Sequence, residues 1–351
     1  MRLGFLVNPN AGVGGPLALR GSDAGLEPGN YAATRAIRAL TSLSRDDIVL
    51  TCGGAMGEDV VQAAGLQARV VHRAVGRSRA ADSIAAVAAL VAEGVDLIAF
   101  AGGDGTARDV LAAAPTVPVL GIPAGVKMHS GVFATSPAAA AAMLADCARA
   151  PRIDSTEAEL SARDAHGVLH LYGMMRTVAG RRRQPAKAMG GADVGAQLAG
   201  AVAATATELA AEPLLVVGPG ATMLALKAAL SGGGTLLGVD VFAHGRLVAR
   251  DADEATLWAL TASSVPRLAL GVIGGQGFLL GRGNRQISAR VTARSGAAGL
   301  VVLASAAKLA ALPGGRLLVD TGDPDLDACL AGHLAVRTGR RQSMLMRVDA
   351  A

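Results

Sequence analysis

Short apolar runs alternate with helix-like stretches along the first half of the chain. The apolar runs predict strands at Leu3–Val7, Ile48–Thr51, Val70–Val71, Leu97–Ala101 and Val117–Ile122. Stretches of helical character lie between them, at Ala32–Leu40, Gly57–Ala64, Ala80–Ala92 and Ala107–Ala114. Continuous apolar strands that alternate with helices are typical of a parallel sheet covered on both faces. The pattern therefore predicts a doubly wound α/β domain.

The pattern changes near Pro151. Ser136 and Pro137 begin an Ala-rich helix that runs to about Ala148, with serine at the cap and proline at the first helical position. Beyond Pro151, strand-like runs recur at Leu214–Val217, Leu236–Phe242, Leu247–Arg250, Leu268–Ile273, Leu300–Leu303 and Leu317–Asp320. We expect an α/β domain over residues 1–150 and a second, sheet-rich domain over residues 151–351. The last segment of the second domain is expected to pack back on the first.

Composition narrows the class of ligand. Among 351 residues, 51% are hydrophobic but only 2% are aromatic, and the net charge is +5. A nucleic-acid binder needs a basic face with aromatic stacking platforms, so small anionic ligands fit better. Three widely spaced cysteines form no CxxC pattern, which favours a reducing cytosol. The apolar stretch near residues 84–101 is interrupted by Glu93 and Asp96, so no membrane span is expected.

The strongest chemical signal is the run AGGDGTARD at 101–109, between a buried strand and a helix. Open α/β sheets bind ligands at this end of their strands. Gly102, Gly103 and Gly105 allow backbone N–H groups to approach phosphate, and the helix N-terminus beside Thr106 adds a positive dipole. Asp104 is suited to accept a proton from a hydroxyl or to help hold Mg²⁺. The alternative is an ordinary Gly-rich turn with Asp as a turn former.

The GGDGT run after a strand resembles the signature shared by NAD kinases, diacylglycerol kinases and sphingosine kinases. The run VNPNAG at 7–12 is similar to the NPxAG loop of that superfamily, and PVLGIPAG at 118–125 resembles its third element. The resemblance covers nearly the whole chain, from Asn8 to about Gly322. It implies that Asn8, Gly12 and Gly125 contact nucleotide together with the GGDGT residues. It also implies that an α/β lobe and a β-rich lobe enclose the site, usually in a homo-oligomer.

Four further runs resemble the ATP- or polyphosphate-dependent, AcoX-like NAD kinases of acetoin-catabolism operons. They are 121–133, 237–241, 273–278 and 281–288. One element differs: NAD kinases carry an Asn-Glu pair that grips a ribose, and the chain contains no Asn-Glu dipeptide. NAD is therefore expected to be a poor acceptor. The lipid-kinase pattern is weaker still, because Ala-Arg-Asp follows Thr106 where that pattern has Leu-Asn-Glu.

Other residues are candidates for substrate or phosphate contacts. Lys127 can neutralise the transferring phosphate and His129 can hydrogen-bond substrate, although a solvated lysine and a packed histidine are the alternatives. The strand–loop–helix arrangement recurs at Gly218, Gly220 and Thr222, as a second phosphate loop or a plain turn. The remaining substrate candidates are Met56, Gly57, Asp240, Gln276, Arg282 and Asn284. Arginine grips phosphate bidentately, and Asp240, inside an apolar run, needs a partner if it is buried.

These features predict a kinase that uses ATP, or polyphosphate, to phosphorylate a hydroxyl of a nucleotide-like or small-metabolite acceptor. Asp104 would accept the hydroxyl proton, Mg²⁺ would accompany the phosphates, and Lys127 or Arg282 would stabilise developing charge. The alternative function is a nucleotide-sensing protein of a catabolic operon that has lost turnover. The expected partners are a nucleotide, an acceptor and further copies of this chain, with neither nucleic acid nor membrane.

Overall fold

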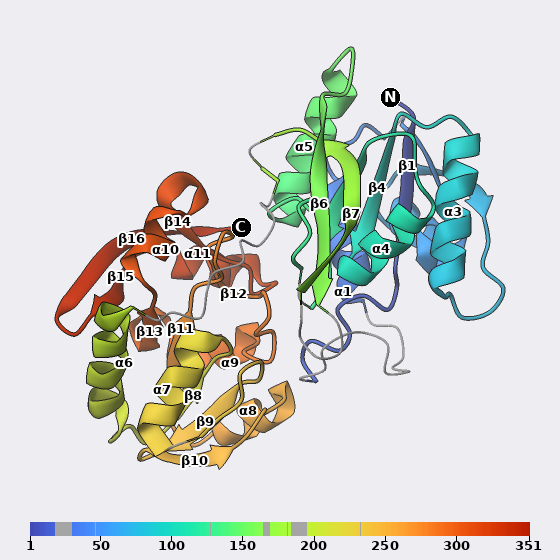
Figure 1. Ribbon diagram of the computed structural model, residues 1–351. Helices are drawn as coiled ribbons and strands as arrows, with labels where there is room; N and C mark the ends of the chain where they lie inside the picture. The colour runs from blue at the N-terminus through green and yellow to red at the C-terminus, as the bar shows by residue number, and fades with distance from the viewer. Residues whose placement is uncertain are drawn as a thin grey trace. The chain divides into compact units, whose positions relative to one another are not determined.

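The computed structural model describes residues 1–17, 30–45, 47–126, 128–163, 169–180, 182–183, 195–231 and 233–351. The chain forms two compact units (Figure 1). The first comprises Met1–Gly14 with Gly21–Lys187, and the second comprises Gly15–Arg20 with Ala188–Ala351. None of the helices in the described residues is long and apolar enough to span a membrane.

The first unit is built on a seven-stranded sheet. Its strands are β1 (Leu3–Val7), β2 (Ile48–Cys52), β3 (Gln67–His72), β4 (Leu97–Gly102), β5 (Val119–Pro123), β6 (Ser155–Arg163) and β7 (Leu169–Val178). They lie in the order β3-β2-β1-β4-β5-β7-β6, and every pair is parallel except β6 with β7. From β1 the chain builds outward to β2 and β3 on one side and to β4 and β5 on the other. The predicted doubly wound parallel sheet is therefore present.

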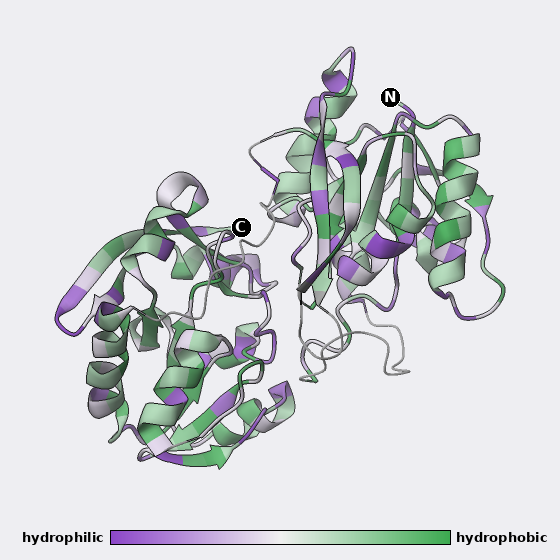
Figure 2. Cartoon of the chain, in the orientation of Figure 1, coloured by the Kyte–Doolittle hydropathy of each residue, from purple (hydrophilic) through white to green (hydrophobic). Residues whose placement is uncertain are grey.

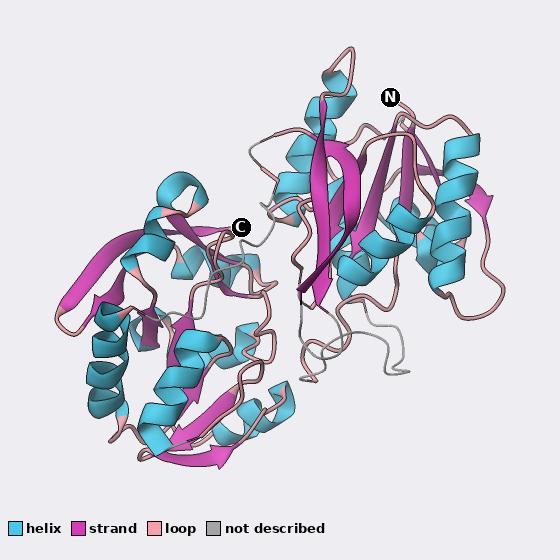
Figure 3. Ribbon diagram, in the orientation of Figure 1, coloured by secondary structure: helices cyan, strands magenta, loops and turns pink. Residues whose placement is uncertain are grey.

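Helices cover both faces of this sheet (Figure 3). They are α1 (Tyr31–Leu40), α2 (Glu58–Ala63), α3 (Ala80–Ala92), α4 (Asp104–Ala112) and α5 (Pro137–Arg149). Because alternate strand residues point to opposite faces, Phe5 packs in the core beneath α1, α2 and α5, whereas Leu6 packs in the core beneath α3 and α4. Ser136 caps α5 as predicted, since its hydroxyl accepts from the backbone N–H of Ala139 at 3.0 Å.

The domain boundary expected at Pro151 differs from the structure. After α5 the chain continues into the β6–β7 hairpin, which adds to the sheet of the first unit. Thr177 of β7 joins the hairpin to β5. It pairs with Val119 of β5, and its hydroxyl donates to the Val119 carbonyl at 2.8 Å. Strand β6 has the sequence STEAELSAR, in which polar residues outnumber apolar ones. Such a half-exposed edge strand lacks the apolar run that marks the inner strands.

The second unit contains a nine-stranded sheet in the order β10-β9-β8-β11-β13-β15-β16-β14-β12. Its strands are β8 (Leu215–Val217), β9 (Asp240–Ala243), β10 (Arg246–Ala249), β11 (Arg267–Gly271), β12 (Phe278–Leu280), β13 (Leu300–Leu303), β14 (Arg316–Val319), β15 (Gly332–Gly339) and β16 (Gln342–Ala350). Strands β8, β11, β13 and β15 are parallel, and the chain reverses at the β15–β16 hairpin. The C-terminal strand β16 pairs with β15 and β14. It therefore completes this sheet, and the expectation that the last segment packs on the first domain stays a prediction.

Helices also cover both faces of the second sheet. They are α6 (Ala196–Leu209), α7 (Ala221–Ser231), α8 (Glu254–Leu260), α9 (Ala289–Ser295), α10 (Ala306–Ala310) and α11 (Pro324–Leu330). Val217 packs with α6 and α7, whereas its neighbour Val216 packs with α8, α9, α10 and α11. Figure 2 shows the apolar colouring that runs along the strands of both sheets. The second unit is thus a mostly parallel α/β unit and contains more helix than the sequence predicted.

Candidate active site

Three strands of the first unit end side by side. Val7 of β1 pairs with Ala101 of β4, which pairs in turn with Ile122 of β5. Because the helices after β1 and β4 pack on opposite faces, the chain diverges between these two strands. Open α/β sheets bind ligands at such a point. The three loops that the sequence singled out therefore start from neighbouring positions at one edge of the sheet.

Backbone and side-chain hydrogen bonds tie the three loops together. The N–H of Asn8 donates to the carbonyl of Ala101 at 2.9 Å, and the N–H of Ala124 donates to the carbonyl of Gly102 at 2.8 Å. The side-chain amide of Asn8 donates to the hydroxyl of Thr106 at 2.9 Å. Two residues predicted to contact nucleotide, Asn8 and Thr106, are thus brought into direct contact. Gly12, at the end of the first loop, has a positive φ of 78°, which favours glycine.

Gly103 and Gly125 meet backbone to backbone. A Cβ atom added to Gly103 would lie 2.8 Å from the Cα of Gly125, and one added to Gly125 would lie 2.6 Å from the Cα of Gly103. Neither position has room for a side chain. The GGDGT run and the PAG turn therefore depend on glycine at both positions in order to pack against each other.

Helix α4 begins three residues earlier than predicted, at Asp104 and not at Ala107. Gly103 occupies the N-cap position, and the first intrahelical bond runs from the N–H of Ala107 to the carbonyl of Gly103 at 3.0 Å. The N–H groups of the first turn therefore have no intrahelical acceptor. They belong to Asp104, Gly105 and Thr106, so most of the GGDGT run is a helix N-terminus, an arrangement that attracts phosphate.

The carboxylate of Asp104 is buried, with 7% of the residue exposed. One oxygen accepts from the backbone N–H of His129 at 2.8 Å. The other accepts from the N–H of Ser130 at 3.1 Å and from its hydroxyl at 2.7 Å. Burial raises the pKa of Asp104 to about 6, although the hydrogen bonds from Ser130 and His129 and the charge of Arg108 favour ionisation. A carboxyl with this pKa is ionised at neutral pH and still basic enough to accept a proton.

His129 and Ser130 belong to a segment that is held on two sides. The N–H of Gly131 donates to the carbonyl of Glu159 on β6 at 2.8 Å, and the N–H of Ala134 donates to Gly121 on β5 at 2.9 Å. His129 itself is 7% exposed and reaches Asp104 through its backbone. A substrate contact by its imidazole remains a prediction, and Lys127 lies outside the described residues.

Sequence reasoning missed two residues that build this site. Ser130 lies within the run 121–133, but the sequence pattern did not predict a functional role for its side chain. Arg35 of α1 is buried and its guanidinium donates to the carbonyl of Pro123, at the start of the PAG turn. An arginine on a helix face normally signals solvent exposure, so nothing in the pattern predicts its burial. The signal that could have identified Ser130 is its hydroxyl, which lies in a run already predicted to contribute to the site.

The described residues do not fit a metal site made by protein side chains alone. Among them, no group of three or more His, Cys, Asp or Glu residues is placed to hold a metal ion. Both oxygens of Asp104 are already engaged by protein donors. A role of Asp104 in holding Mg²⁺ therefore stays a prediction.

The second predicted phosphate loop lies between β8 and α7 in the second unit. The N–H of Gly218 donates to Ala269 at 2.9 Å, and the N–H of Gly220 donates to Leu236 at 2.8 Å. These two N–H groups therefore serve the fold of the unit and do not point to a ligand. Thr222 lies in the first turn of α7 and is partly exposed, so a ligand contact there stays a prediction.

Three substrate candidates of the second unit are buried, each about 5% exposed. The guanidinium of Arg282 lies 4.5 Å over the ring of Phe278, and its Nε is 3.7 Å from a carboxylate oxygen of Asp320. The side-chain amide of Asn284 donates to the carbonyl of Leu279 at 2.7 Å, and Gln276 lies in the turn before β12. Arg282 and Asn284 are thus held by the protein, and their substrate contacts remain predictions.

Three other candidates, Asp240, Met56 and Gly57, have clear structural roles, and their substrate contacts stay predictions. Asp240 is fully buried in an ion pair with Lys227, whose ammonium lies 2.9 Å from the carboxylate. Burial opposes ionisation of Asp240, but bonds from Asp251, Lys227 and Thr235 hold its pKa below the usual range. Met56 is 3% exposed and packs in the core with α3. Gly57 is required by shape, because a Cβ there would lie 2.1 Å from the hydroxyl of Thr51. All three positions serve the fold.

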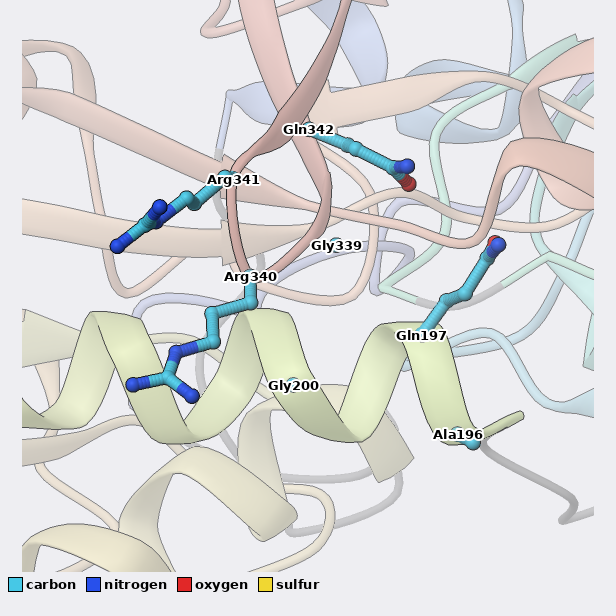
Figure 4. A pocket seen from close by; sticks show the side chains of 7 residues that line it. All are labelled: Ala196, Gln197, Gly200, Gly339, Arg340, Arg341 and Gln342. Atoms are coloured by element: carbon cyan, nitrogen blue, oxygen red, sulfur yellow. The ribbon is translucent and has the colours of Figure 1, made fainter.

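A separate hollow of about 580 Å³ lies in the second unit, beside the turn between β15 and β16. Its lining is Ala196, Gln197, Gly200, Gly339, Arg340, Arg341 and Gln342. The two arginines extend to one side of the turn and Gln342 to the other (Figure 4). None of the predicted site residues lines this hollow.

The fold and the first-unit site define an α/β protein whose glycine-rich helix N-terminus carries a buried carboxylate. The family models of the ATP-NAD kinase N-terminal domain and of the ATP-NAD kinase C-terminal domain match residues 3–152 and 211–348, respectively. The chain belongs to the NAD kinase family. This confirms the predicted superfamily and its kinase fold.

Solved structures add little to this assignment. Three structures of Bacillus anthracis str. Sterne proteins that bear the name diacylglycerol kinase share 17%, 19% and 19% identity with the chain, with TM-scores of 0.26, 0.26 and 0.24. Each match covers 44% of this chain, and 45%, 44% and 45% of those chains, so this chain spans less than half of their length. Among curated proteins, no match is found.

Proposed function

We propose that this protein is a kinase that transfers the terminal phosphoryl group of ATP to a hydroxyl of a small, nucleotide-like acceptor. The observation that carries the proposal is Asp104, a buried carboxylate in the first turn of α4 and next to the glycine contact between Gly103 and Gly125. A base and a phosphate-attracting helix N-terminus are two of the elements that phosphoryl transfer to a hydroxyl uses.

In the proposed reaction the acceptor hydroxyl oxygen attacks the terminal phosphorus while its proton passes to Asp104. A new oxygen–phosphorus bond forms, the bond to the bridging oxygen breaks, and ADP leaves with the electron pair. The N–H groups at the start of α4 orient the phosphates, and electrostatic positioning supplies most of the rate. Mg²⁺ belongs to this scheme as a companion of the nucleotide substrate, since the described residues do not build a metal site.

The test is phosphate transfer from labelled ATP, and separately from polyphosphate, to a panel of nucleosides, nucleotides and small hydroxylated metabolites. Asp104→Asn should lower turnover on the best acceptor by about 10²- to 10⁴-fold, because it removes the base and keeps the shape. Asp59→Asn is the matched control: Asp59 also lies in the first turn of a helix after a glycine, but is exposed. Binding of ATP without transfer to any acceptor would favour a sensing protein instead.

The acceptor is a separate proposal. The chain lacks the Asn-Glu pair expected for ribose recognition, and polar contacts of this kind contribute about 0.5–3 kcal/mol each. We therefore expect NAD to be a poor acceptor compared with a smaller metabolite or a different nucleotide. The measurement is NADP formation from NAD and ATP. A catalytic efficiency of about 10⁴ M⁻¹s⁻¹ or above would show that other residues recognise NAD.

The cytosolic location and the homo-oligomer predicted from the sequence stay predictions. Size-exclusion chromatography with light scattering measures the second of these directly.

A further inference from the structure

The hydroxyl of Ser130 lies between two oxygen atoms. Its Oγ is 2.7 Å from a carboxylate oxygen of Asp104 and 2.9 Å from the backbone carbonyl oxygen of Ser161 on β6. Ser130 is fully buried and Ser161 is buried beside it. Both distances are those of hydrogen bonds. Ser130 therefore links the candidate base to strand β6 through its hydroxyl.

A serine hydroxyl carries a single proton. When Asp104 is ionised, both neighbours of Oγ are acceptors, so the proton can satisfy only one of them. When Asp104 is protonated, its own proton can bond to Oγ, and the proton of Ser130 is free for the carbonyl of Ser161. The two short contacts are thus both satisfied only after Asp104 has gained a proton.

We propose that Ser130 is the positioning residue for Asp104 and follows its state of protonation. The hydroxyl of Ser130 donates to the carboxylate while Asp104 is ionised. It rotates to donate to the carbonyl of Ser161 once Asp104 has taken the acceptor's proton. The proton that leaves the acceptor ends on the Asp104 carboxyl and points to Oγ, while Ser130 keeps its own proton throughout. This inference rests on the proposed role of Asp104 as proton acceptor.

The surroundings fix the geometry that such a switch needs. The backbone N–H groups of His129 and Ser130 hold both carboxylate oxygens. The bond from Gly131 to Glu159 holds the segment against β6. Rotation of one hydroxyl is then the only movement required. Among the described residues, the charge of Arg108 on the same helix acts on Asp104, and His129 on the adjoining segment contacts it through its backbone N–H.

The first test is the pH dependence of turnover. Ser130→Ala removes a hydrogen bond that favours the carboxylate, so the acid limb of the pH–rate profile should move up by about one to two pH units. Activity lost at neutral pH should return at higher pH, with little change in KM for ATP. Ser130→Thr keeps a hydroxyl and should restore the wild-type profile, whereas Ser130→Cys, a weaker donor, should fall between.

Two controls separate other causes. Ser83→Ala removes another buried serine of the first unit, on α3, and should leave the profile in place. His129→Asn keeps the backbone donor and removes the imidazole, so an acid limb that persists in this variant belongs to Asp104. An acid limb that does not move in Ser130→Ala, with the protein folded by circular dichroism, would overturn the proposal.

The second test needs no turnover. Carboxyl-carbon NMR of the labelled full-length protein follows the titration of Asp104 in wild type, Ser130→Ala and Ser130→Thr. The midpoint should rise in the alanine variant and return in the threonine variant, and identical midpoints would refute the link between the two residues. If the midpoints differ as expected but Asp104→Asn retains full kinase activity, the proposed role of Asp104 fails while the coupling of Ser130 to Asp104 stands.

Discussion

Two glycines of the GGDGT run should respond in opposite directions to the same substitution. A Cβ on Gly103 would lie 2.8 Å from the Cα of Gly125, where neither backbone can yield cheaply. Gly105 is exposed within α4, and the nearest atom to an added Cβ is a guanidinium nitrogen of Arg108 at 3.9 Å. Gly103→Ala should therefore destabilise the first unit by about 1–3 kcal/mol through overpacking. Gly105→Ala should stabilise it by about 0.5–1 kcal/mol.

The two variants should consequently differ by roughly 2–4 kcal/mol, or on the order of 4–16 °C in Tm for a unit of this size. Far-UV circular dichroism follows both units during unfolding. The single tryptophan, Trp258, lies on α8 and reports on the second unit alone. Gly103→Ala with unchanged stability, or both variants shifting in the same direction, would show that the loops do not meet as described.

Three further substitutions test other parts of the structure, each by urea unfolding. The pKa of Asp104 is about 6 in the folded protein, against an ordinary value of 3.8, so the folded state binds a proton more tightly than the unfolded state does. The free energy of unfolding should therefore fall by about 3 kcal/mol as the pH rises from about 4 to about 7. Asp104→Asn should remove this pH dependence. Lys227→Met leaves the buried Asp240 carboxylate without its cation and should cost about 3–5 kcal/mol, of which adding Asp240→Asn should recover part. Gly57→Ala places a Cβ against the hydroxyl of Thr51 and should cost about 1–3 kcal/mol, and Thr51→Ala in the same chain should relieve the clash.

The sequence predicted well those strands of both sheets that are short apolar runs between turns. β1 and β13 have the predicted bounds, and β4 extends one residue further than predicted. The β6 edge of the first sheet was not predicted, since β6 alternates polar and apolar residues and Thr156, Glu157 and Glu159 are exposed. The β15–β16 hairpin was missed for the same reason. Strands of this mixed pattern are defined by their pairing partners, which periodicity along one chain does not reveal.

The candidate site was predicted in part. Gly103, Asp104 and Gly125 could be predicted because they follow the ends of two apolar strands, and in a parallel sheet these ends lie at the same edge. The contact of Ser130 with Asp104 is long-range, 26 residues along the chain, and depends on how the segment after β5 folds back. The buried ion pair of Asp240 was not predicted either. Its partner Lys227 comes from α7, and only the packed structure shows that the pair is buried.

The path of the chain between the two units has a consequence for how the protein is made. Residues 15–17 belong to the second unit, where the carbonyl of Pro16 accepts from the N–H of Glu254 at 2.7 Å. The preceding residues, up to Gly14, belong to the first unit. On the ribosome, this early segment must therefore wait for more than two hundred residues of later chain before it can dock. A single proteolytic cut just before α6 would break the covalent link, but residues 15–17 would remain part of the first fragment while docked in the second unit. Neither unit can therefore be expressed intact as one uninterrupted fragment.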